Sequence, residues 1–131
     1  MDYGQTIEVG LSFEEALPKV KEAFKEQGFG TLTEIDVRAT LKEKIGRDIE
    51  PYTILGTCNP ELAGRALDIE RDIGLLLPCN VVVTERDGKT LVQALDPQVM
   101  VSVPGNDELK PIAEEAGARI DKALASLTNV S

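Results

Sequence analysis

The dipeptide Asp87-Gly88, between the apolar segments 81–86 and 89–95, constrains the fold more than any other feature of the sequence. Asp-Gly favours a two-residue hairpin turn because both positions tolerate a positive φ. Such a turn sets the register of both strands, since the side chains of a strand alternate between two faces. The resulting pairs are Arg86 with Lys89, Val83 with Val92, Val81 with Ala94 and Cys79 with Asp96.

The rest of the sequence alternates short strands with amphipathic helices. Further strands are expected at residues 5–9, 30–37 and 52–58, and a final strand at 98–103. The first helix is expected to run from the capping box of Ser12 and Glu15 to Gly28. Further helices are expected at 39–45, at 60–70 and from about 107 to 127, and residues 73–78 are expected to be irregular. This order predicts one α+β domain over residues 1–131, with helices on one face of a mostly antiparallel sheet.

The charge balance excludes several classes of partner. Acidic residues outnumber basic ones by 23 to 14, and the net charge is −9. Nucleic-acid and anionic-membrane binding both depend on lysine and arginine, so neither partner is expected. Residues 1–9 resemble no signal peptide, and the apolar runs are too short to span a bilayer. We therefore expect a cytoplasmic protein whose cysteines are free thiols.

The chain has two cysteines and no histidine, which removes many mechanisms. Neither a Ser-His-Asp triad nor a Cys-His pair can form. The sequence also lacks a Cys-x-x-Cys motif, a phosphate-binding loop and a zinc-finger ligand set. Chemistry is left to thiols, carboxylates, amines and the backbone, and the sequence specifies no cofactor.

Cys58 precedes Asn59 and Pro60, which fit the N-cap and the first position of a helix. The partial positive charge of a helix N-terminus can lower the pKa of a thiol, which makes Cys58 the candidate nucleophile. The alternative is a small buried residue that packs on Ala63, four positions into the helix. Asn59 is most simply the cap.

Cys79 occupies the end of the apolar face of the hairpin, opposite Asp96 in the expected register. A nearby carboxylate raises the pKa of a thiol, so Cys79 is expected to be the less reactive and more structural cysteine. Asn80 projects to the opposite face, where it either binds a ligand or holds a loop. If the strands that carry Cys58 and Cys79 run antiparallel, both thiols lie at one end of the sheet.

Glu34 and Asp36 are two residues apart on one face of a predicted strand. Carboxylates at this spacing can bind a cation or carry out acid–base chemistry. The alternative is a solvated outer face, which is common in antiparallel sheets.

Several segments carry a resemblance to a known family: residues 28–37 with 41–44, the run Tyr-Thr-Ile-Leu-Gly-Thr-Cys-Asn-Pro at 52–60, and the run Gly-Leu-Leu-Leu-Pro-Cys-Asn-Val-Val-Val at 74–83. Together they resemble the bacterial and archaeal family catalogued as domain of unknown function 302. The resemblance implies a TATA-binding-protein-like arrangement of strand, helix, four strands and helix, in a curved antiparallel sheet. It supports antiparallel strands at the two cysteines and implies no activity.

The leading hypothesis is a small cytosolic binding domain whose expected partners are a second copy of the chain and a small ligand or metal ion. The ligand would lie where Cys58, Asn59 and Cys79 converge with Glu34 or Asp36. One alternative is a cysteine-dependent redox or transfer enzyme with Cys58 as nucleophile. Another is an oligomerisation module whose Leu-Leu-Leu run, 75–77, meets a partner.

Overall fold

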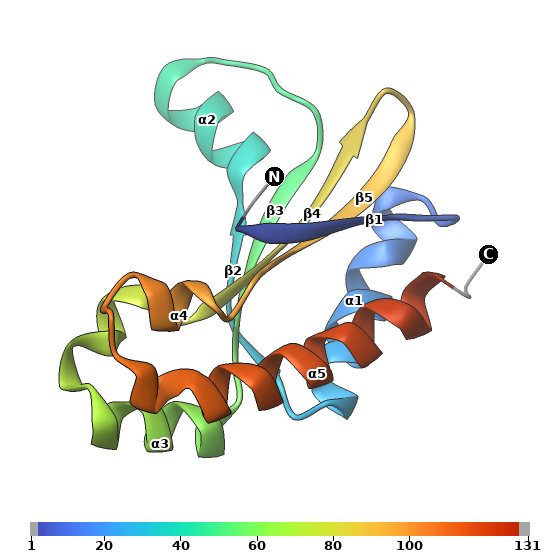
Figure 1. Cartoon of the computed structure of the whole chain (residues 1–131). Helices are drawn as coiled ribbons and strands as arrows, with labels where there is room; N and C mark the ends of the chain where they lie inside the picture. Colours follow the sequence, from blue (N-terminus) through green and yellow to red (C-terminus); the bar gives the residue numbers. More distant parts are fainter. Residues whose placement is uncertain (1–2, 129–131) are drawn as a thin grey trace.

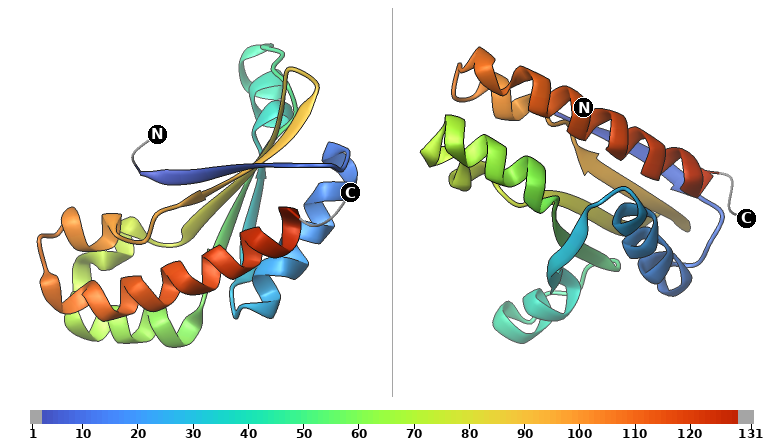
Figure 2. Two further views of the ribbon diagram at one scale, coloured as in Figure 1. Left: turned by 45° about the vertical axis from the view of Figure 1, so that its right-hand side comes forward. Right: turned by 90° about the horizontal axis from the view of Figure 1, so that it is seen from below.

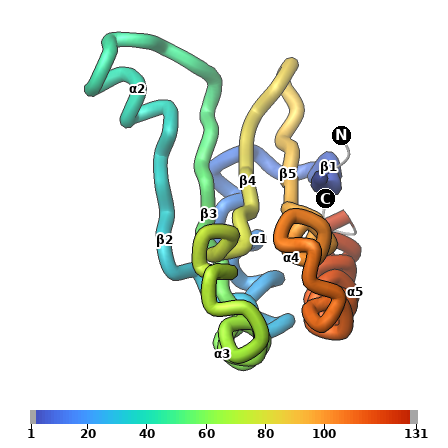
Figure 3. The backbone as a smooth tube through the Cα atoms, turned by 60° about the vertical axis from the view of Figure 1, so that its left-hand side comes forward, coloured from blue at the N-terminus to red at the C-terminus, as the bar shows by residue number. Residues whose placement is uncertain are grey.

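Five antiparallel strands form one open sheet in a computed structural model that describes residues 3–128 (Figure 1). The strands are β1 (Gly4–Val9), β2 (Gly30–Asp36), β3 (Tyr52–Cys58), β4 (Cys79–Arg86) and β5 (Lys89–Leu95). Their spatial order is β1-β5-β4-β3-β2, so β4 is the central strand and β1 and β2 are the edges (Figure 3). The predicted α+β order of strand, helix, four strands and helix is confirmed.

Five α-helices connect or follow these strands. They are α1 (Phe13–Glu26), α2 (Val37–Ile45), α3 (Pro60–Ile69), α4 (Val99–Ser102) and α5 (Lys110–Thr128), with 3₁₀ turns η1 (Arg71–Leu76) and η2 (Asp107–Leu109). Helices α1, α3 and α5 cover one face, whereas α2 stands clear of them (Figures 1 and 2). Within residues 3–128, no helix is both long and apolar enough to cross a membrane.

The hairpin of β4 and β5 has the register that the sequence predicts. Arg86 pairs with Lys89, and the pairs Val83–Val92 and Val81–Ala94 follow. The turn residues Asp87 and Gly88 have φ values of 55° and 77°, which is the left-handed conformation that a type I′ turn requires. Strand β5 ends at Leu95, so the expected pairing of Cys79 with Asp96 is not part of the ladder.

The core lies between the inner face of the sheet and the apolar stripes of the helices. Helix α1 begins at the predicted capping box, in which Ser12 Oγ accepts from Glu15 N–H at 3.2 Å. Its buried residues recur at helical spacing, as do those of α5. Each fully buried aliphatic side chain contributes roughly 1.5–3 kcal/mol, so these stripes hold both helices on the sheet. The largest fully buried side chains are Phe24, Phe29, Leu55, Ile73 and Leu109.

Three local predictions need correction. Residues 98–103 form α4 and a following turn instead of a strand, because the Asp96 carboxylate accepts from Gln98 N–H at 2.9 Å and starts a helical turn. Residues 71–76 form a 3₁₀ helix instead of an irregular segment. Helix α2 begins at Val37, two residues early, because Asp36 caps it by accepting from Ala39 N–H at 2.9 Å.

Gly56, in the middle of β3, allows a close approach of two other segments. A Cβ atom at this position would overlap Thr33 Oγ1 on β2 and would lie 2.9 Å from Cγ of Pro78. By contrast, a Cβ atom at Gly64 in α3 would have no heavy atom within 4 Å. The two glycines therefore form a matched pair for testing the packing around β3.

We expect Gly56→Ala to lower the free energy of unfolding by roughly 1–3 kcal/mol, the usual cost of overpacking. Gly64→Ala should raise it by about 0.5–1 kcal/mol, since alanine is the better helix former. Urea unfolding followed by circular dichroism measures both changes. Equal stability of Gly56→Ala and the wild type would contradict the packing described here.

Candidate functional site

The two cysteines lie at the same end of the sheet. Strands β3 and β4 are antiparallel, with Thr57 directly opposite Cys79, so Cys58 is offset by one residue from that pair. The Thr57 hydroxyl donates to the Cys79 carbonyl at 2.9 Å and fixes this end of the ladder. Both cysteines are partly buried free thiols. The prediction that they share one end of the sheet is confirmed, and they form no disulfide.

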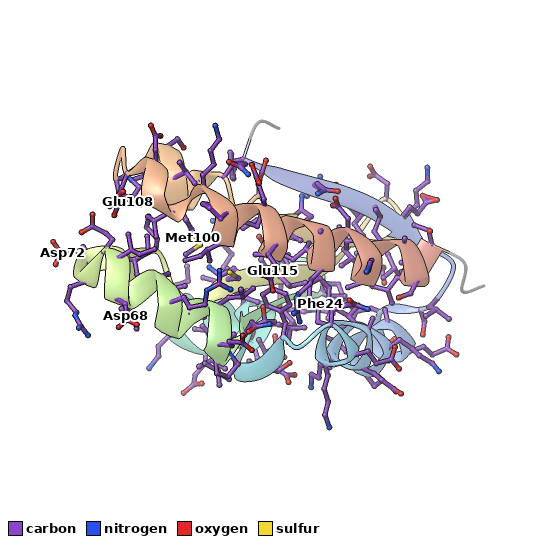
Figure 4. The ribbon with its side chains drawn as sticks, turned by 60° about the horizontal axis from the view of Figure 1, so that its bottom comes forward. Phe24, Asp68, Asp72, Met100, Glu108 and Glu115 are labelled. Atoms are coloured by element: carbon purple, nitrogen blue, oxygen red, sulfur yellow. The ribbon has the colours of Figure 1, made fainter. Side chains whose placement is uncertain are left out.

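Both thiols line a cavity between the sheet, α3 and α5. Its volume is about 30 Å³, and its walls present no nitrogen or oxygen atom. The lining residues are Phe29, Thr57, Cys58, Asn59, Leu62, Ala63, Ala66, Leu77, Cys79, Met100, Leu109, Ile112, Ala113 and Ala116. Met100 reaches the region between α3 and α5 from α4, as Figure 4 shows. The site is therefore an apolar pocket to which three sulfur-containing side chains contribute.

Asn59 has the structural role of an N-cap. Its Oδ1 accepts from Leu62 N–H at 3.1 Å, as the sequence predicts. Asn59 is 8% exposed, and its amide packs against Gly28, where a Cβ atom would lie 2.8 Å from Nδ2. Gly28 has a φ of 86°, so it also ends α1 in the left-handed conformation that glycine favours. This contact orients the first turn of α3 and with it the wall of the cavity that carries Cys58 and Ala63.

The other predicted site residues lie elsewhere. Asn80 pairs with Gly56 and projects to the face opposite Cys79, as expected, where it borders a shallow groove. Glu34 lies opposite Leu55 and forms an ion pair with Lys21 of α1. Asp36 caps α2. Because Cys58 pairs with Gly30, four residues from Glu34, the strand rise separates these positions by roughly 13 Å. The expected convergence of Glu34 or Asp36 with the cysteines therefore does not occur.

The sequence interpretation did not include Met100 or Phe29 in the site. Met100 lies in segment 98–103, which the sequence predicts as a strand, and its position in the cavity depends on the helical turn that Asp96 begins. Phe29 follows Gly28 and is 2% exposed, so its apolar character was the available signal. The stripe that lines the cavity from α5, at 109, 112, 113 and 116, was found by its helical spacing.

Comparison with known proteins places this arrangement in a family. Residues 5–127 match the family described as "Domain of unknown function DUF302". The chain belongs to this family. It is also similar to a solved structure described as "Crystal structure of uncharacterized conserved protein DUF302 from Bacillus stearothermophilus". The two are 31% identical, the match covers 97% of this chain and 99% of that chain, and the TM-score is 0.90. No curated protein matches the chain.

In this DUF302 domain, burial controls the chemistry of both thiols. Desolvation raises the pKa of Cys58 above its ordinary value. Desolvation and the nearby Cys58 together raise the pKa of Cys79 to about 11. Of the two interpretations of Cys58, the raised pKa favours the partly buried packing residue over a thiol activated by the N-terminus of α3. Cys79 is the less acidic cysteine, as expected, but the causes are burial and Cys58 instead of Asp96.

Slow alkylation of both cysteines near neutral pH is the first expected consequence, because the thiolate is the reactive form. Cys58, the less deeply buried thiol, should react first as the pH rises, and Cys79 should require a pH near 11. Mass spectrometry of the DUF302 domain after iodoacetamide treatment at increasing pH measures both rates. In Cys58→Ser, the pKa of Cys79 should fall but stay above 9.0, since desolvation remains.

The same shifts predict a loss of stability at alkaline pH. A thiol with a raised folded-state pKa favours folding fully below its unfolded value of 9.0, and this contribution declines as the pH rises toward the folded value of about 11. The Cys79→Ala variant should lose less stability over this range than the wild type. If the free energies of unfolding of the two proteins decline in parallel between these pH values, the raised pKa does not belong to Cys79.

Proposed function

We propose that this domain binds a small, uncharged, apolar ligand in the cavity lined by Cys58 and Cys79. The observation that carries the proposal is the composition of the cavity, whose walls present no nitrogen or oxygen. Small-molecule sites are typically concave and mostly apolar, with few polar groups. Asn59, although it lines the cavity, uses its Oδ1 to cap α3, so the ligand is recognised by shape and by contact with carbon and sulfur.

The size of the cavity limits the ligand. About 30 Å³ compares with roughly 150 Å³ for an apolar cavity that binds benzene. The resting cavity therefore accepts only a few heavy atoms, and a larger ligand requires α3 to move away from α5. The polar link between these helices is an exposed ion pair of Arg65 and Glu115, 3.4 Å apart. Exposed pairs of this kind contribute roughly 0–1 kcal/mol, so this link opposes the movement only weakly.

A cysteine-dependent redox or transfer enzyme has less support. Such a mechanism needs a thiolate near neutral pH, whereas burial raises the pKa of both Cys58 and Cys79. Among residues 3–128, no histidine, carboxylate or further cysteine joins the two thiols in a group of three. A base that could activate Cys58 is therefore missing from the described cavity.

Ligand binding can be tested with xenon and benzene as apolar probes, followed by changes in the NMR signals of cavity residues such as Leu62 and Ala113. Ala63→Met places a flexible side chain into the cavity and should weaken binding by at least about tenfold, or ~1.4 kcal/mol. Ala125→Met, on the exposed side of α5, is the matched control and should bind as the wild type does. Unchanged spectra with both probes, or equal binding by both variants, would refute the proposal.

A single soft metal ion is the second candidate ligand, favoured by the three sulfur-containing residues Cys58, Cys79 and Met100. Thiolate and thioether ligands select soft ions such as Cu(I). A monovalent ion with one thiolate has no net charge, which suits a wall without nitrogen or oxygen. The same volume that excludes most organic molecules accommodates one ion.

Anaerobic titration with Cu(I) against a coloured competing chelator tests this second candidate. We expect one ion per chain, with an affinity that rises with pH because the bound thiol must lose its proton. Met100→Leu keeps the volume but removes the sulfur, so it should weaken Cu(I) binding and preserve binding of the apolar probes. Undiminished binding in a Cys58→Ser, Cys79→Ser double variant would eliminate the metal site.

A further inference from the structure

Leu75 is the most exposed of the large apolar side chains among residues 3–128, with 89% of its surface accessible to water. It lies in η1 and opens the run of three leucines at 75–77. Leu76 and Leu77 pack against the hydrophobic core, and Leu77 also lines the cavity. Packing therefore explains two leucines of the run and leaves Leu75 without a role within the described chain.

Leu75 borders a groove between η1 and the turn that follows α4. Ile73 and Leu76 line it from η1, and Val103 and Pro104 line it from the other side; we call it the tip groove. Its volume is about 370 Å³, which lies within the roughly 300–1,000 Å³ of typical ligand sites. Val103 is 64% exposed, so two large apolar side chains meet at this groove in contact with water. Exposed apolar side chains that gather at one place mark interaction sites, whereas single ones are ordinary.

The two charged residues that line the tip groove, Glu70 and Asp72, are both acidic. Within residues 3–128, neither carboxylate forms an ion pair, so both can pair with a cationic partner. Asp68 of α3 and Glu108 of η2 add negative charge at the same end of the molecule, as Figure 4 shows. The tip groove therefore combines an apolar lining with an acidic rim.

The basic residues of this end, Arg71 and Lys110, lie outside the lining of the tip groove. Arg71 and Asp72 are successive residues of a 3₁₀ helix, in which three residues make one turn, so their side chains point to different sides. Lys110 is the first residue of α5. Neither base therefore neutralises the acidic groups that face the groove.

Charge decides which partner fits the tip groove. A second copy of the chain carries the same net charge of −9, so it is repelled from an acidic rim. The anionic lipids of a membrane surface are repelled in the same way. A partner rich in lysine and arginine is attracted instead, and this attraction also raises its rate of association. The apolar lining further requires that the partner present large apolar side chains beside its bases.

We propose that the tip groove binds a basic amphipathic segment of another protein. The apolar side chains of this segment contact Leu75 and Val103, while its lysines or arginines pair with Glu70 and Asp72. Amphipathic helices bind apolar grooves in this way, with their charged residues at the rim. The tip groove shares no lining residue with the cavity, so this proposal is independent of the cavity ligand.

Fluorescence anisotropy of labelled synthetic peptides, titrated with the full chain, tests the proposal. The first peptide repeats Leu-Lys-Lys-Leu, the second Ser-Lys-Lys-Ser, and the third Leu-Glu-Glu-Leu. The first should bind, and the second, which has the same charge, should bind at least about tenfold more weakly because it buries no apolar surface. The third should not bind, since its carboxylates meet those of the rim. Added salt should weaken binding of the first peptide, because salt screens exposed ion pairs.

Leu75→Ser tests the apolar part of the tip groove. It should weaken binding of the Leu-Lys-Lys-Leu peptide by at least about fivefold, since the apolar contact is lost. Leu32→Ser, at a 67% exposed position on the edge strand β2, is the matched control and should bind as the wild type does.

The double variant Glu70→Gln, Asp72→Asn tests the acidic rim. It should bind the same peptide more weakly and with less dependence on salt, because two ion pairs are lost. Glu14→Gln with Glu22→Gln, at exposed positions of α1, changes the net charge by the same amount and should leave binding and its salt dependence unchanged.

Several results would overturn the proposal. Equal binding of the leucine and serine peptides would show attraction by charge alone, and equal binding by Leu75→Ser and Leu32→Ser would place the peptide elsewhere. Sedimentation velocity gives a third outcome: self-association of the wild type that Leu75→Ser abolishes would make a second copy the occupant. Circular dichroism establishes whether each variant is folded. If Leu75→Ser is unfolded, Val103→Ser replaces it, with the same outcomes.

Discussion

The antiparallel pairing of β4 with β3 and β5 is the constraint on which the rest of the structure depends. It places Thr57 opposite Cys79 and brings both thiols to one end of the sheet. It also directs Val81 and Val83 to the core and Val82 to the opposite face of the sheet. A shift of one residue would exchange these two sets of side chains, so the composition of both faces follows from the same register.

The apolar environment of the cavity decides what its thiols can do. A negative charge near a helix N-terminus is stabilised by about 0.3–1 kcal/mol. This stabilisation competes with the free-energy cost of removing a thiolate from water. At Cys58 desolvation raises the pKa. Asn59 already binds Leu62 N–H at the start of α3, which leaves one donor fewer for an anion. The burial that makes the cavity suitable for an uncharged ligand therefore makes its cysteines poor nucleophiles.

The two faces of the sheet differ in what covers them. The inner face, with α3 and α5, encloses the cavity, whereas the outer face carries Ile54, Val82 and Gln93. Gly56 lies between them on β3, where Thr33 and Pro78 occupy the space that a side chain would need. Close packing at this position holds β2 and the start of β4 against β3, which supports both surfaces.

The sequence by itself determined the features that depend on neighbouring residues. The Asp87-Gly88 turn, the Ser12 capping box, the Asn59 cap and the stripe of α5 each form through contacts within a few positions, so their patterns were sufficient. Only the tertiary structure decided how distant residues combine. It places Met100 of α4 against the cavity, and it directs Glu34 to Lys21 instead of the cysteines. It also raised the Cys58 pKa, because desolvation depends on the packing of α3, α5 and the sheet around the thiol, which no local pattern records.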